Sequence, residues 1–146
     1  MSVTWQLTPR QSIAAECGRR GRPAVVAGCI ALLQGRQDVD DTLLLALGGP
    51  AAESVLAGQA GGKAGYWPRV WAARGLLHAW DDRATAVIIQ ATADSAWRVR
   101  EMAAKVIARH RVGAAFPAVA ALREDQTPRV QAAAARAVVI LTASAS

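Results

Sequence analysis

The chain has 146 residues, of which 53% are apolar and 5% aromatic, and its formal net charge is +6. This length suits a single domain that buries its own core without disulfides or metal ions. The N-terminus lacks the basic start and apolar run of a signal peptide, and no uninterrupted apolar stretch is long enough for a transmembrane helix. We therefore expect a cytoplasmic protein, in which Cys17 and Cys29 stay reduced.

Thr8 is predicted to cap the first helix, which starts at Pro9 and ends near residue 20. Gln11 completes a capping box with Thr8, and Gly21 ends the helix. Three further helices are predicted over residues 23–34, 43–47 and 51–56, followed by a glycine-rich loop over residues 58–65.

From residue 67 onward the predicted helices alternate in pairs. Their expected bounds are residues 68–80, 83–92, 96–110, 113–122 and 128–141, and residues 142–146 are expected to form a disordered tail. In the helix over residues 96–110, helical spacing places Val99, Met102, Ala103, Val106 and His110 on a buried stripe, with Arg98, Glu101, Lys105 and Arg109 on the opposite, solvated side.

An internal repeat of about 31 residues organises this half of the chain. Residues 94–105 align with residues 125–136, and a third copy aligns at the same offset through residues 72–76. A period in this range is typical of repeat proteins, whose units bury their apolar faces against their neighbours.

At these positions the chain resembles the short bacterial HEAT-like repeats. The shared motif is an acidic residue in the inter-helix turn, a Val-Arg pair at the start of the second helix, and an Ala-Ala step one turn later. The residues that match it in full are Asp94, Val99, Arg100, Ala103 and Ala104, and those of the next copy are Asp125, Val130, Ala134 and Ala135, with Gln131 replacing the arginine.

The resemblance implies an all-α, right-handed α-α superhelix of about four to five antiparallel helix pairs, with ion pairs linking successive repeats. It covers roughly residues 50–141, within one domain over residues 1–141. Because members of the family act as scaffolds, adaptors, lyase-related proteins and nucleic-acid binders, it implies the fold and leaves the function open.

The repeat offset also predicts a partner-binding surface. It gives Arg74, Lys105 and Arg136 equivalent positions on three successive second helices, and it pairs Arg98 with Arg129 in the same way. We therefore expect a row of cations that binds an anionic partner, with Trp67 and Trp97 as aromatic anchors. The alternatives are a merely solvated face for the cations and core packing for the tryptophans.

The sequence favours a non-catalytic binding or adaptor module. A protein is the first-choice partner and nucleic acid the second, and self-association into a homodimer is also open. One alternative is a relative of the HEAT-like alkylpurine DNA glycosylases, with Trp80, Asp81 and Asp82 near a lesion, although the two aspartates equally suit a helix cap. We expect no catalytic motif, no cofactor and no metal site, because the histidines and cysteines are dispersed.

Overall fold

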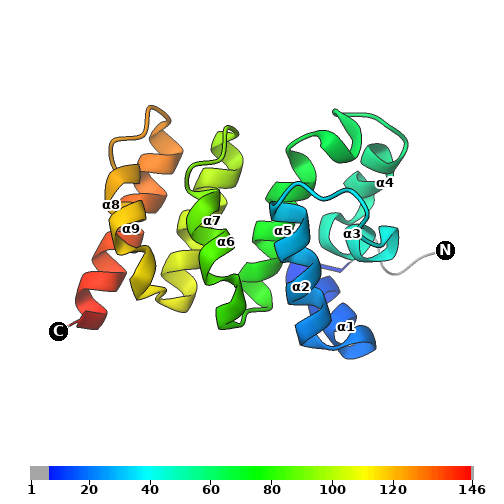
Figure 1. Ribbon diagram of the computed structural model, residues 1–146, viewed down its shortest axis with the longest axis horizontal. Helices are drawn as coiled ribbons and strands as arrows, with labels where there is room; N and C mark the ends of the chain where they lie inside the picture. Colours follow the sequence, from blue (N-terminus) through cyan, green and yellow to red (C-terminus); the bar gives the residue numbers. More distant parts are fainter. Residues whose placement is uncertain (1–6, 146) are drawn as a thin grey trace. The chain divides into compact units, whose positions relative to one another are not determined.

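The computed structural model describes residues 7–145, and all regular secondary structure in this range is helical (Figure 1). The chain divides between Ala84 and Thr85 into two compact units, which we call the first and the second unit. Among the described helices, none is long and apolar enough to cross a membrane. The first six residues, where the signal-peptide prediction falls, lie outside the described range, as does Ser146.

The first unit contains five α-helices and two short 3₁₀ helices in its described part. The capping box predicted at Thr8 and Gln11 is confirmed, because both reciprocal bonds are present. The bounds are α1 (Pro9–Arg20), α2 (Arg22–Leu33), α3 (Asp41–Gly48), α4 (Pro50–Leu56), η2 (Gly62–Ala64), α5 (Trp67–His78) and η3 (Asp82–Ala84).

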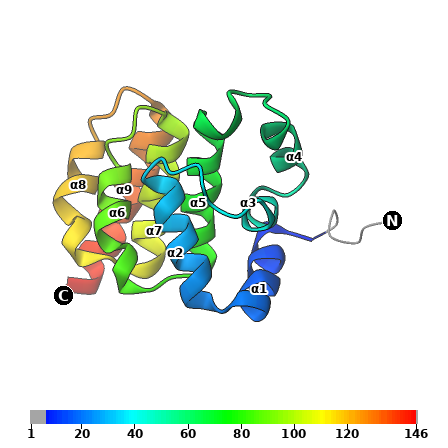
Figure 2. The same cartoon turned by 45° about the vertical axis from the view of Figure 1, so that its right-hand side comes forward.

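Glycines let the helices of the first unit approach closely. Helix α5 packs along α2 and also contacts α1 and α3 (Figure 2). A Cβ atom at Gly75 of α5 would lie 2.7 Å from both Cys29 Sγ on α2 and Leu47 Cδ2 on α3. Likewise, a Cβ atom at Gly48 would lie 2.6 Å from the buried ring of Trp71. A larger residue at either position would therefore overpack this core.

The second unit repeats one arrangement of helices at an interval of 31 residues. Helix α6 packs on α7, α8 packs on α9, and α7 packs on α9. Both α8 and α9 begin 31 residues after α6 and α7, respectively. The bounds are α6 (Thr85–Ala91), α7 (Trp97–His110), η4 (Gly113–Ala115), α8 (Phe116–Leu122) and α9 (Pro128–Ala145).

Two features of the second unit differ from the sequence-based expectations. Helix α9 continues past residue 141 to Ala145, so most of the expected disordered tail is helical. The Thr142 hydroxyl donates to the carbonyl oxygens of Val138 and Val139, which satisfies this polar group within the helix. Glu101 of α7 was expected on the solvated face, but it is buried, with 8% of its surface exposed.

An ion pair ties the turn before α9 to α7. Arg100 Nε donates to Asp125 Oδ2 at 2.7 Å, and its Nη1 donates to the carbonyl oxygen of Asp94 at 2.8 Å. One repeat later, Gln131 Nε2 donates to the carbonyl oxygen of Asp125. The glutamine thus keeps the bond to the turn that the arginine makes in the preceding copy, although it carries no charge for a further ion pair.

Candidate binding groove on the second unit

A groove of about 490 Å³ runs between α7 and α9. Three alanines and one isoleucine line it, together with four cations and one carboxylate. We call it the basic groove, and it is lined by Glu101, Lys105, Ala108, Arg109, Arg129, Ala132, Ala133, Arg136 and Ile140. Three of the predicted partner-binding residues therefore lie together in this groove, namely Lys105, Arg129 and Arg136.

Helical spacing explains why the groove combines charge with apolar surface. Lys105 and Arg109 are four residues apart on α7, and Ala132, Arg136 and Ile140 are spaced by four on α9, so each set shares one face of its helix. The opposite faces carry buried residues such as Ala103 and Ala134, which have no exposed surface. The packed faces hold the two helices together, and the cations extend from the other side.

Glu101 organises part of the groove. Its carboxylate lies 3.1 Å from Arg129 Nε and 3.6 Å from Lys105 Nζ. Because Glu101 is buried, these contacts compensate the cost of removing its charge from water. Arg109 and Arg136, in contrast, form no ion pair with any residue in the described range. The groove therefore retains an excess of positive charge.

Trp97 contacts two of the predicted arginines at one end of α7. The guanidinium carbon of Arg98 lies 4.5 Å from the centroid of the Trp97 ring, and that of Arg129 lies 5.2 Å away. Both distances suit cation–π interactions. Arg129 thus bridges Trp97 and Glu101, so the predicted residues Trp97, Arg98 and Arg129 form one connected cluster.

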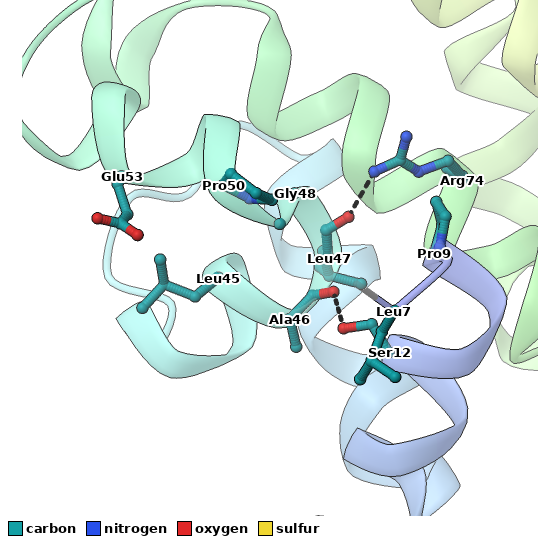
Figure 3. A pocket seen from close by; sticks show the side chains of 11 residues that line it. Leu7, Pro9, Ser12, Leu45, Ala46, Leu47, Gly48, Pro50, Glu53 and Arg74 are labelled. Carbon is teal, nitrogen blue, oxygen red and sulfur yellow. Dashed lines mark hydrogen bonds between the residues drawn. The ribbon is translucent and has the colours of Figure 1, made fainter. Parts of the chain in front are cut away.

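The remaining predicted residues, Arg74 and Trp67, lie on α5 of the first unit. Arg74 is half-buried and lines a separate pocket within that unit, where its Nη2 donates to the carbonyl oxygen of Leu47 at 2.7 Å (Figure 3). Trp67 stacks on the buried Trp71, with ring centroids 6.1 Å apart, and it contacts Tyr66. That Arg74, Lys105 and Arg136 occupy equivalent positions on successive second helices of the repeats stays a prediction.

No family model, curated protein or solved structure matches this chain.

The aspartates considered for the glycosylase alternative have local partners. Asp81 Oδ1 accepts from the backbone N–H of Arg83 at 2.9 Å, and its carboxylate pairs with the Arg83 guanidinium. These bonds to Arg83 lower the pKa of Asp81. Trp80 Nε1 donates to Asp82 Oδ1 at 3.3 Å. Asp81 is therefore an ionised residue that caps the 3₁₀ helix η3, as the alternative assignment to a helix cap predicted.

Arg109 and Ile140 are among the groove residues that were not predicted from the sequence. Arg109 was assigned to a solvated face, and it could have been included because it follows Lys105 by one helical turn. Ile140 of α9 lies beyond the aligned segments, although the offset of 31 residues makes it the counterpart of Arg109. The helical spacing from Arg136 is the signal that identifies it.

Proposed function

We propose that this protein is a non-catalytic binding module that recognises an acidic segment of a partner protein through the basic groove. The observation that carries this proposal is the excess of cations in a groove that also has apolar lining residues. Four cations line the groove with one carboxylate, and neither Arg109 nor Arg136 has an ion-pair partner in the described range. An acidic segment would supply the missing carboxylates, and arginine binds carboxylate in a planar, bidentate geometry.

The apolar surface favours a protein over a nucleic acid. Ala108, Ala132 and Ile140 offer contacts to aliphatic side chains, whereas they add nothing to the binding of a phosphodiester backbone. Val139 strengthens this argument, because it is 65% exposed and lies seven residues after Ala132 on the same face of α9. The fitting partner is an acidic, amphipathic segment with aliphatic residues on one side.

Charge argues against a second copy of this chain as the occupant of the groove. Two copies that met through their basic grooves would bring Arg109 and Arg136 of each copy close together without a carboxylate between them. Like charges in a desolvated interface are destabilising by several kcal/mol. A homodimer would therefore have to use another surface.

We also propose that the second unit consists of two HEAT-like helix pairs within an α-solenoid. The support is the interval of 31 residues, which recurs in the helix bounds, in the bonds to the turn at Asp94 and Asp125, and in the motif itself. The ion pair between Arg100 and Asp125 is of the kind that the resemblance implies between successive repeats.

The free thiols of Cys17 and Cys29 support a reducing compartment such as the cytoplasm.

A salt series distinguishes the two classes of partner. The probes are a fluorescent peptide in which glutamate and leucine alternate at helical spacing, a peptide with the same charge but serine in place of leucine, and a duplex DNA of 20 base pairs. We expect the leucine-containing peptide to bind most tightly in fluorescence anisotropy and to retain part of its affinity at high salt. Tighter binding of the duplex, with a steep salt dependence, would instead support a nucleic-acid-binding function.

A further inference from the structure

A second pocket lies within the first unit, apart from the groove proposed above to bind a partner. It has a volume of about 360 Å³ and lies between the start of α1, the junction of α3 with α4, and α5 (Figure 3). We call it the Arg74 pocket. Its lining residues are Leu7, Pro9, Ser12, Leu45, Ala46, Leu47, Gly48, Gly49, Pro50, Glu53 and Arg74. This volume lies within the range of sites that bind small molecules.

Arg74 is incompletely partnered in this pocket. Its Nη2 donates to the carbonyl oxygen of Leu47 at 2.7 Å, but its Nε is shielded from solvent and has no acceptor in the described range. Burial lowers the pKa of Arg74, and no neighbouring carboxylate offsets this effect. A half-buried guanidinium without a counterion is costly, and an anionic ligand would remove that cost.

The other lining residues determine which chemical groups suit the rest of the ligand. Leu7, Leu45 and Pro50 present apolar surface to the cavity. The Ser12 hydroxyl donates to the carbonyl oxygen of Ala46 at 2.7 Å, so this donor is already used. Arg74 is therefore the cation in the lining, and the remaining surface suits a hydrocarbon group.

Glu53 limits the charge that a ligand can carry. It is exposed, and in Figure 3 it lies at the opposite end of the pocket from Arg74, with Pro50 between them. A second anionic group at the far end of a ligand would approach this carboxylate and be repelled. A single carboxylate at the Arg74 end meets no such repulsion.

We propose that the Arg74 pocket binds a small monocarboxylic acid, with its carboxylate on the Arg74 guanidinium and its apolar body against Leu7, Leu45 and Pro50. The planar fork of arginine matches a carboxylate, and the cavity admits a short aliphatic or aromatic chain. This site is separate from the basic groove, so it can exist whether or not the groove binds an acidic protein.

Isothermal titration of the full chain tests the proposal with four matched probes. These are hexanoate, the neutral hexan-1-ol, the cationic hexylamine and the dicarboxylate adipate. We expect saturable binding of hexanoate and at least roughly tenfold weaker binding of the other three, because each loses the charge-assisted bond or meets Glu53. No saturable binding of hexanoate, or equal binding of hexan-1-ol, would overturn the proposal.

Variants assign the binding to the pocket. Arg74→Met removes the guanidinium and should weaken hexanoate binding roughly tenfold or more. Leu45→Trp narrows the cavity while it keeps Arg74, and it should abolish binding. Arg123→Met removes an exposed arginine of the second unit and should leave the affinity unchanged. Circular dichroism verifies that each variant is folded. If Arg74→Met does not fold, the hexanoate affinity of Leu45→Trp tests the proposal in its place. An unchanged affinity in that variant would contradict the proposal.

Discussion

Arg100 of α7 holds Asp125 through two hydrogen bonds, from Nε at 2.7 Å and from Nη2 at 3.2 Å. Both side chains are largely buried, with 13% and 9% of their surface exposed. Asp125 also accepts from the backbone N–H of Thr127 at 2.9 Å, just before α9 begins. One carboxylate therefore caps a turn and joins two helices whose packing forms the basic groove.

Removing this carboxylate should destabilise the second unit. Asp125→Ala leaves the Arg100 guanidinium bonded to the carbonyl oxygen of Asp94 but without its carboxylate in a mostly buried place, so we expect a loss of about 3 kcal/mol in the free energy of unfolding. Urea unfolding followed by circular dichroism at pH 7 measures this loss. Asp38→Ala is the control, because it breaks an ion pair with Arg36 in which both side chains are exposed, and it should change stability little.

The same pair predicts how stability depends on pH. The hydrogen bond from Arg100 lowers the pKa of Asp125 in the folded protein. Asp125 therefore contributes its full stabilisation above a pH of about 3.9, the pKa of an aspartate in the unfolded chain. This stabilisation is lost as the pH falls through the lower pKa that Asp125 has in the folded protein. We expect the stability difference between the wild type and Asp125→Ala to shrink as the pH falls below about 4. A stability difference that does not change with pH would mean that Asp125 has the same pKa in the folded and the unfolded protein.

Close helix packing in the first unit predicts opposite effects for two glycine substitutions. Gly48→Ala places a Cβ atom 2.6 Å from the Trp71 ring and should cost about 1–3 kcal/mol through overpacking. Gly18→Ala in α1 meets no atom within 4 Å and should stabilise the chain by about 0.5–1 kcal/mol. Urea unfolding compares the two variants. Equal changes in the free energy of unfolding would show that the close approach of Gly48 to the Trp71 ring does not require glycine.

The two thiols should differ in reactivity. Burial raises the pKa of Cys29 to about 12, and it also raises the pKa of the half-buried Cys17. Since the thiolate is the reactive form, we expect Cys29 to resist a thiol-specific disulfide reagent in the native protein at pH 8. Both cysteines should react in denaturant. Rapid labelling of Cys29 in the native chain, detected by mass spectrometry, would contradict its placement in the core.

The helix pattern of this chain could be predicted from local chemistry, but parts of the site could not. Thr8, Gly21 and Pro50 act on their immediate neighbours, so the helix ends that they mark agree with the structure to within a few residues. Glu101 was misplaced because its burial depends on Arg129, which follows 28 residues later. Helical spacing alone assigned it to the solvated side, and only the packing of α7 on α9 brings Arg129 against its buried side chain.

Glu101 offers a test of the charge balance in the groove. Glu101→Gln preserves the shape of the side chain but frees Arg129 and Lys105 from their shared carboxylate. We expect the variant to bind the acidic, leucine-containing peptide several-fold more tightly, because two more cations become available. Fluorescence anisotropy measures the change. Weaker or equal binding in a folded variant would indicate that Glu101 does not compete with the ligand.

The most direct test of the central claim is the affinity of that peptide for a charge-reversed groove. Lys105→Glu with Arg136→Glu changes two exposed groove cations, and Arg10→Glu with Arg123→Glu makes the same change in net charge at exposed positions outside the groove. In anisotropy at physiological salt, we expect the groove variant to lose at least roughly tenfold in affinity and the control to change less than threefold. Equal losses in both folded variants would contradict recognition through the basic groove.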